Sequence, residues 1–271
     1  MIDILKVILL SFVEGLTEFL PISSTGHLIL VNEFIKLEPE SFANIFSIII
    51  QLGAIMSVVV LYFSRLNPFS KEKKEAQKKE TLRTWGLVIV GVLPAVILGL
   101  KFDDFIDAHL MNSYVVAAML FIWGIGIILI EKMNKKATII NLSGMSYRTA
   151  FLIGIAQCFA MIPGTSRSAA TIIGAMLLGC NRKVAAEFSF FLAIPTMFGA
   201  TLLKVVKIFV KGIPITGFEV FLIVLGMVLS FIVALVVIKK FMRYIKEHDF
   251  VPFGIYRIAL AVIVVIYFIA K

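Results

Sequence analysis

Six long apolar segments constrain the fold of this chain more than any other feature. They span 42–63, 85–100, 114–130, 184–206, 218–238 and 253–270. A bilayer core of about 30 Å takes roughly 20 apolar residues per helix, with about 17 as the lower end. The segments are continuously apolar rather than alternating, which excludes a membrane β-barrel. The sequence therefore predicts an all-α polytopic membrane protein with six transmembrane helices, of which 85–100 is short and contains Pro94.

Composition excludes the soluble alternatives. Of the 271 residues, 60% are hydrophobic and 16% are charged, whereas an average soluble domain is about 45–50% apolar and about 25% charged. Such a chain cannot bury its apolar surface in one soluble core. A soluble enzyme, a disordered chain and a fibrous protein are excluded.

Two further apolar stretches, 2–31 and 149–180, are interrupted in the middle. The first contains Pro21 followed by the polar run 23–27, and the second contains Pro163 followed by the polar run 164–168. Each predicts two short helices joined by a break. This pattern is typical of a re-entrant helical hairpin whose tip lies at membrane depth and lines a polar cavity.

The two broken stretches also align with each other. With a shift of 142 residues, EFLPISST (18–25) falls on AMIPGTSR (160–167), and Phe46-Ser47 falls on Phe188-Ser189. We therefore predict a single membrane domain, 1–271, built as an inverted repeat of 1–140 and 143–271. Inverted repeats with broken helices place the functional site near the midplane, where the breaks meet.

Loop charges predict the orientation. Segments 64–84, 131–150 and 239–250 carry seven, four and four Lys or Arg, whereas 101–111 has one Lys against three Asp. The first three are predicted to be cytoplasmic and 101–111 to lie outside. The exception is 204–215, an expected outer loop that contains Lys204, Lys207 and Lys211. We attribute the net charge of +9 to topology rather than to nucleic-acid binding.

Other sequence signals are negative. The N-terminus lacks a basic n-region and a cleavage site, so we do not expect a removed signal peptide. Cys158 and Cys180 have no CxxC spacing, so we expect neither a disulfide framework nor a zinc site.

Ionisable residues inside apolar segments are costly and usually functional. We single out Glu14, Glu18, His27, Arg167 and Glu187. Glu14 and Glu18 lie one helical turn apart, on one face. Two carboxylates there repel unless a cation lies between them, and hard Mg²⁺ or Ca²⁺ suits such a pair. The alternative is a pair hydrogen-bonded to neighbouring hydroxyls.

The run after Pro21 places three hydroxyls, Ser23, Ser24 and Thr25, close to His27. Helix capping explains one or two of the hydroxyls. The sharper hypothesis is a hydroxyl nucleophile with a histidine base. We choose Ser24 as the nucleophile, or as the group that positions the attacking water, and His27 as the proton-transfer residue. The sequence leaves open which of Ser23, Ser24 and Thr25 attacks.

The run after Pro163 combines a turn before a helix with a guanidinium, a combination that suits an anion. The predicted phosphate-binding residues are Gly164, Thr165, Ser166, Arg167 and Ser168. Arg167 could instead pair with Glu18, and the two roles are compatible. All these parts together match phosphoryl transfer, and their place in a membrane predicts a lipid phosphate as substrate.

At this point the sequence resembles a known family. EGLTEFLPISSTGHL (14–28) and PGTSRSAATI (163–172) are similar to the two signature regions of bacterial undecaprenyl-diphosphate phosphatase, the bacitracin-resistance family. The resemblance covers essentially the whole chain, including QLGAI (51–55) and AAEFSFFLAIP (185–195). The family usually reads SRSG where this chain has Ala169, which adds a Cβ beside the phosphate clamp and removes no chemical group.

The resemblance implies hydrolysis of undecaprenyl diphosphate to the monophosphate and inorganic phosphate. This reaction recycles the lipid carrier for peptidoglycan synthesis and confers bacitracin resistance. It also implies six spanning helices with two re-entrant hairpins, the plasma membrane of a bacterium and a possible homodimer. The site residues that it implies are Glu14, Glu18, Ser23, Ser24, Thr25, His27 and Arg167 with its neighbours, to which we add Gln51 of the QLGAI stretch as substrate-binding.

One alternative stays open, and a second is rejected. A secondary transporter or flippase of lipid phosphate shares the inverted-repeat pattern, but it needs no nucleophile and base together. A passive structural subunit leaves the intramembrane charges unexplained. If 64–84 is cytoplasmic, the first hairpin begins and ends outside, so the site is expected to open to the outer face.

Overall fold

In the computed structural model, which describes residues 2–210 and 215–270, the regular elements are helical. They are α1 (Ile2–Thr17), α2 (Ser24–Phe34), α3 (Glu40–Leu61), α4 (Phe63–Leu66), α5 (Glu75–His109), α6 (Ser113–Lys132), α7 (Tyr147–Cys158), α8 (Arg167–Leu177), α9 (Arg182–Val210), α10 (Gly217–Tyr244) and α11 (Val251–Ala270). Short 3₁₀ turns occupy Leu142–Gly144 and Phe159–Met161.

Six of these helices, α3, α5, α6, α9, α10 and α11, are long and apolar enough to cross a membrane. They coincide with the six predicted segments, so the prediction of an all-α multi-pass membrane protein is confirmed. The two broken stretches form the short pairs α1–α2 and α7–α8. Their re-entrant placement stays a prediction.

The bounds of α5 differ most from the prediction. The apolar segment 85–100 is only the middle of a helix that runs from Glu75 to His109 and includes Pro94. Hydropathy misses both ends because they carry charged residues. α9 likewise continues to Val210, so part of the expected outer loop 204–215 is helical. The side chains of Asp103, Asp104, Asp107 and Lys207, and residue Lys211, lie outside the described part of the chain.

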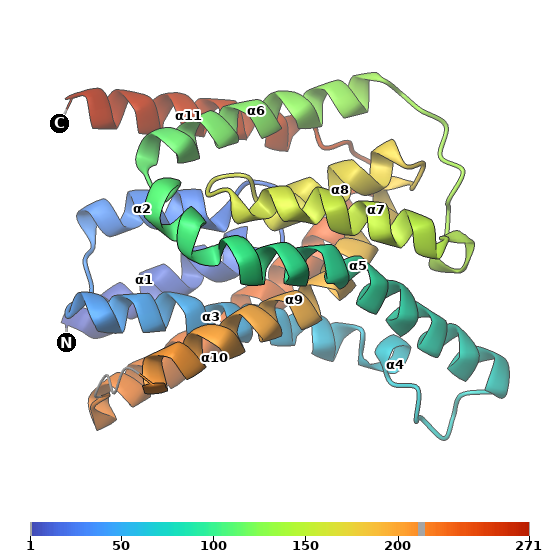
Figure 1. Cartoon of the computed structure of the whole chain (residues 1–271), viewed down its shortest axis with the longest axis horizontal. Helices are drawn as coiled ribbons and strands as arrows, with labels where there is room; N and C mark the ends of the chain where they lie inside the picture. Colours follow the sequence, from blue (N-terminus) through green and yellow to red (C-terminus); the bar gives the residue numbers. More distant parts are fainter. Residues whose placement is uncertain (1, 211–214, 271) are drawn as a thin grey trace.

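The helices pack in close pairs, α3 on α10, α6 on α11, α5 on α7 and α1 on α10 (Figure 1). Small residues allow this closeness. A Cβ at Gly254 of α11 would lie 2.7 Å from the carbonyl oxygen of Gly124 in α6. The pair α6–α11 therefore cannot accept a larger side chain at this crossing without moving apart.

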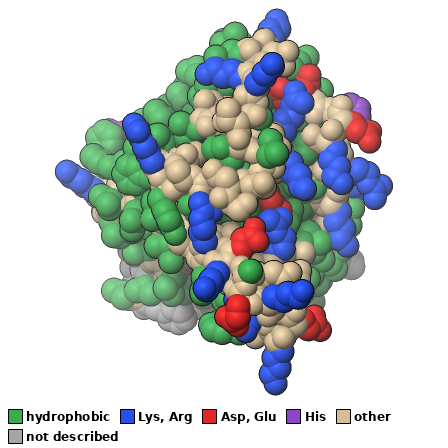
Figure 2. Space-filling model, turned by 90° about the vertical axis from the view of Figure 1, so that its right-hand side faces the viewer, with side chains coloured by type: hydrophobic (Ala, Val, Ile, Leu, Met, Phe, Trp, Pro, Cys, Tyr) green, Lys and Arg blue, Asp and Glu red, His purple; other side chains and the backbone are tan. Residues whose placement is uncertain are grey.

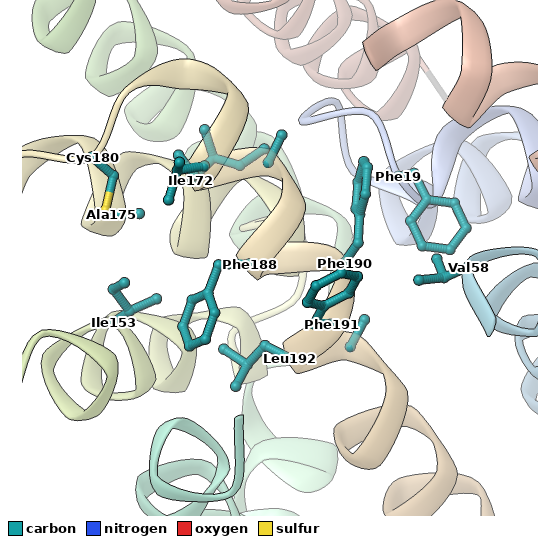
Figure 3. Packing of buried hydrophobic residues seen from close by; sticks show 14 of the residues in the cluster. Phe19, Val58, Ile153, Ile172, Ala175, Cys180, Phe188, Phe190, Phe191 and Leu192 are labelled. Carbon is teal, nitrogen blue, oxygen red and sulfur yellow. The ribbon is translucent and has the colours of Figure 1, made fainter. Parts of the chain in front are cut away.

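α9 forms the centre of the packing. Phe188, Phe190 and Leu192 on this helix are fully buried, and Figure 3 shows them between the side chains of neighbouring elements. Phe190 meets Phe19 edge to face, with ring centroids 5.3 Å apart. Because Phe19 lies in the break between α1 and α2, this contact fixes the first break against the middle of α9.

The two breaks end in the same kind of helix cap. Ser23 precedes α2 and Ser166 precedes α8, with φ of 72° and 71°. Their hydroxyls accept from the backbone N–H of Gly26 (3.2 Å) and Ala169 (3.3 Å). Positive φ is uncommon outside glycine, so the shared cap geometry is a specific likeness. The caps are one residue out of step with the alignment above, which pairs Ser24 with Ser166. The inverted repeat itself stays a prediction.

Basic side chains gather at one end of the molecule. Figure 2 shows this end, formed by α4, the start of α5 and the loop after α6. Lys71, Lys74, Lys135 and Arg148 are exposed there. Both termini lie at the opposite end in Figure 1. The loops with the strongest positive charge are therefore on one side, as a single cytoplasmic face requires.

Candidate active site

The first carboxylate pair lies where α1 runs into the break. The backbone N–H of Glu18 donates to the Glu14 carbonyl at 3.0 Å, so the helical turn continues to Glu18. This places both side chains on one face, as predicted. Glu14 is fully buried, and among the described residues neither of its carboxylate oxygens has a hydrogen-bond partner.

Glu18 joins the two breaks. Its Oε2 accepts from the Ser24 hydroxyl at 2.7 Å, and its Oε1 lies 3.5 Å from Nη2 of Arg167. Both partners of this ion pair are about nine-tenths buried, with side chains 10% and 9% exposed. The pairing of Arg167 with Glu18 that the sequence allowed is thus present. One carboxylate contacts a hydroxyl of the first break and the guanidinium of the second.

Contacts with Ser189 of α9 orient the Arg167 guanidinium. Its Nη1 donates to the Ser189 carbonyl at 2.9 Å and lies 3.4 Å from the Ser189 hydroxyl. That hydroxyl is 2.6 Å from the hydroxyl of Thr171. The guanidinium is therefore held in one direction before any anion binds.

The Ser168 side chain links the second break to the first. Ser168 donates to the carbonyl of Leu20 at 2.9 Å, and its hydroxyl lies 3.0 Å from that of Ser166. These predicted substrate-binding hydroxyls thus have structural partners in the structure.

His27 is engaged through both ring nitrogens. Nδ1 lies 2.7 Å from the Ser23 carbonyl, and Nε2 lies 2.6 Å from the Tyr256 hydroxyl, with the two rings stacked. A carbonyl can only accept, so Nδ1 carries a proton, and in the neutral ring Nε2 accepts from Tyr256. Within the part of the chain that the structure describes, His27 makes no hydrogen bond to Ser24. Its proton-transfer role stays a prediction.

A cavity of about 480 Å³ opens beside these groups. Thr25, Arg167 and Gln157 supply polar groups to its lining, and most of the remainder is apolar side chain from α5 and α9. Lys204 of α9 lines it too, so one of the lysines that disagreed with the loop-charge rule lies at this cavity. An anionic head with an apolar tail matches such a lining.

The remaining predicted site residues do not all lie at the cavity or at the turn before α8. Thr165 is fully buried, with a hydroxyl that has no partner among the described residues, and Gly164 has a φ of 91°. Both belong to the turn before α8. Gln51, by contrast, lies in α3, does not line the cavity, and makes no side-chain hydrogen bond to the other predicted site residues.

The carboxylate pair offers oxygen ligands of the kind that a divalent cation uses, and metal binding there stays a prediction. Over residues 2–210 and 215–270 no cluster of three or more His, Cys, Asp or Glu side chains is present. Mg²⁺ commonly uses only one or two carboxylates and completes its shell with water and substrate phosphate oxygens. The two oxygens of Glu14, which have no partner in the described part of the chain, are the ligands that such an ion would use.

Comparison with known proteins decides the family. Residues 7–263 match the family described as bacitracin resistance protein BacA. The chain belongs to the BacA family. An undecaprenyl-diphosphatase of Limosilactobacillus fermentum is 52% identical over 99% of this chain and 98% of its own length. Proteins of the same name from Lactiplantibacillus plantarum and Enterococcus faecalis are 52% and 49% identical, covering 99% and 97% of this chain and 98% and 97% of their own lengths.

Three residues at the site of this BacA-family chain were missed by sequence reasoning. They are Ser189, Tyr256 and Arg257, which contact Arg167, His27 and the backbone of both breaks. Arg257 should have been found, because it is a charged residue inside the apolar segment 253–270. Glu187, which was singled out, lies elsewhere and pairs with Arg65.

Proposed function

We propose that this BacA-family chain hydrolyses undecaprenyl diphosphate to undecaprenyl phosphate and inorganic phosphate. The observation that carries the proposal is Glu18, whose carboxylate contacts the Ser24 hydroxyl and the Arg167 guanidinium at once. A hydroxyl, a carboxylate and a guanidinium in one buried cluster are the parts that phosphoryl transfer needs. Relatives about 50% identical over nearly the whole chain bear the matching name.

The diphosphate would bind at the turn before α8. Arg167 offers a planar fork that matches two phosphoryl oxygens, and binding there exchanges its contact with Glu18 for contacts with substrate. The apolar side chains of the cavity would cover the first isoprene units. The site thus selects an anionic head joined to an apolar chain.

Ser24 is the proposed nucleophile, or the group that orients the attacking water. Its hydroxyl donates to Glu18, so this carboxylate is in place to accept the proton when Ser24, or a water that Ser24 orients, attacks the terminal phosphorus. The bond to the bridging oxygen breaks and the lipid monophosphate leaves. Where Ser24 is the nucleophile, water then hydrolyses the phosphoserine to inorganic phosphate and regenerates the Ser24 hydroxyl; where water attacks, inorganic phosphate forms directly. His27 serves as the proton-transfer residue only after its Nε2 releases the Tyr256 hydroxyl.

Glu14 and Glu18 would hold Mg²⁺ or Ca²⁺. Such an ion neutralises charge on the diphosphate and on the carboxylate pair. The support is the burial of Glu14, whose two carboxylate oxygens have no hydrogen-bond partner among the residues that the structure describes.

We place the enzyme in the plasma membrane of a bacterium, with the cavity open to the outer side. The cavity includes residues near the carboxyl ends of α5 and α9, away from the basic end of Figure 2. There it would regenerate the lipid carrier for peptidoglycan synthesis, and its abundance would raise bacitracin resistance. A homodimer is part of this proposal on family resemblance alone.

Phosphate release by the purified protein tests the function. The protein in detergent is given undecaprenyl diphosphate with Mg²⁺, with Ca²⁺, or with a chelator. We expect inorganic phosphate with either metal and its loss with chelator, restored by added metal. No release under any condition, together with lipid movement across vesicles that contain the protein, would support the flippase alternative instead.

A further inference from the structure

Arg257 is buried in the first half of α11 without a carboxylate partner among the described residues. It is the largest of the fully buried side chains, at 0% exposed. The ion pairs of the described residues do not include it. A buried cation is costly unless its donors are satisfied.

Backbone carbonyls accept hydrogen bonds from its guanidinium. Nη1 lies 3.2 Å from the Pro21 oxygen, and Nη2 lies 2.8 Å and 3.0 Å from the oxygens of Gly164 and Thr165. Nε and Nη2 also reach the carbonyls of Leu120 and Met119 in α6, at 3.3 Å and 3.2 Å. Carbonyls in a helix break lack partners from their own helix. One guanidinium thus supplies donors to both breaks and to α6.

The adjacent residue acts on the first break as well. Tyr256 holds the His27 ring, while Arg257 holds the carbonyl of Pro21, six residues earlier. The close crossing of α6 and α11 also positions the Arg257 side chain, because the Cβ of Arg257 lies close to Gly124 at this crossing.

We propose that Arg257 is a positioning residue for the hydrolytic reaction, which fixes the two breaks in the relative placement that brings Ser24 and Glu18 to Arg167. It acts through backbone and contacts none of the reacting groups. The inference rests on the proposed function. A lysine at this position keeps the charge but has a single nitrogen, which cannot reach carbonyls on two breaks and a helix in the same fork geometry.

The test compares Arg257→Lys with the wild type for phosphate release from undecaprenyl diphosphate. Misplacement of reacting groups by about 1 Å costs about 100-fold in rate. We expect kcat to fall by about 100-fold and KM to change by less than about threefold. Arg182→Lys is the control, because Arg182, although 41% exposed, also makes several guanidinium hydrogen bonds, to the buried Glu131, and lies outside the site. It should keep kcat within about twofold, since its contacts do not touch the site.

A double-mutant cycle separates positioning from folding. If Arg257 acts through the placement of Arg167, then Arg257→Lys in an Arg167→Ala background should lower kcat by less than about threefold further. If the two substitutions lower kcat independently, so that their fold-losses multiply, the proposal is overturned. An Arg257→Lys enzyme with normal kcat and only a lowered Tm also overturns it. If Arg257→Lys does not accumulate, Gly254→Ala, which must push α11 from α6, takes its place with the same expected non-additivity. A wild type without phosphate release would instead overturn the proposed function.

Discussion

At the scale of single residues, the three hydroxyls after Pro21 have separate surroundings. Ser23 caps α2 through Gly26, Ser24 donates to Glu18, and Thr25 is exposed at the cavity. The sequence could not distinguish them, because adjacent positions in a break follow no helical or strand periodicity. Because their contacts differ, removal of each hydroxyl should affect the protein in a different way.

Ser24→Ala should remove activity with little loss of stability. Its hydroxyl contacts the Glu18 carboxylate and caps no helix, so we expect kcat to fall by at least about 100-fold. Ser23→Ala should do the reverse and lower stability by about 1 kcal/mol through loss of the cap. Phosphate release and thermal unfolding in detergent check both. A Ser24→Ala enzyme with near-normal kcat would remove Ser24 from the mechanism.

Ala169→Gly restores the residue usual in the family. Ala169 is fully buried within the main apolar cluster and lies in the first turn of α8. Glycine there removes a packed methyl group and favours the unfolded backbone, so stability should fall by about 1 kcal/mol. Activity should stay within about threefold, since no polar contact is lost. A large gain in kcat would mean that the Cβ of Ala169 obstructs the clamp.

At the scale of elements, the sequence predicted what depends on apolar length and missed what depends on contacts between distant segments. The six spans were found because each needs roughly 20 apolar residues. The ends of α5 were lost because charged turns extend beyond the apolar middle. Arg257 was overlooked because one charge barely lowers the hydropathy of α11, and nothing in a sequence shows that Pro21 and Gly164 supply its acceptors.

The turn before α8 should tolerate little change. Gly164 has a φ of 91°, and a Cβ there would lie 2.5 Å from the Val116 carbonyl. Gly164→Ala therefore combines backbone strain of about 1–3 kcal/mol with a clash against α6. We expect a lower Tm and a loss of phosphate release. As a control, Gly199→Ala, which has open space around its Cβ, should keep its Tm. Equal Tm values for the two variants would contradict the turn geometry.

At the scale of the whole molecule, basic loops at one end and a cavity toward the other give the protein a direction across the membrane. By charge count alone, the three lysines of the expected outer loop 204–215 disagreed with this orientation. Lys204 resolves part of the conflict, because it lines the cavity, where a cation can attract a diphosphate from the side that we propose to be outer.

Cysteine labelling tests this orientation. Thr25→Cys is placed at the cavity in a chain that lacks Cys158. The remaining Cys180 is buried, and burial raises the pKa of its thiol to about 12. Because the thiolate is the reactive form, Cys180 should stay unlabelled near pH 7. We expect an impermeant maleimide to label Thr25→Cys in intact cells, and undecaprenyl diphosphate to protect it. Labelling only after permeabilisation would place the cavity on the inner side.

The most direct test concerns the carboxylate that joins the two breaks. Glu18→Gln keeps the size of the side chain but removes the charge that contacts Ser24 and Arg167. Glu187→Gln is its control, a second intramembrane carboxylate that pairs with Arg65 outside the site. Phosphate release from undecaprenyl diphosphate by purified, folded protein should fall by at least about 100-fold in Glu18→Gln and stay within about threefold in Glu187→Gln. Near-normal release by Glu18→Gln would show that the two breaks do not form the hydrolytic site.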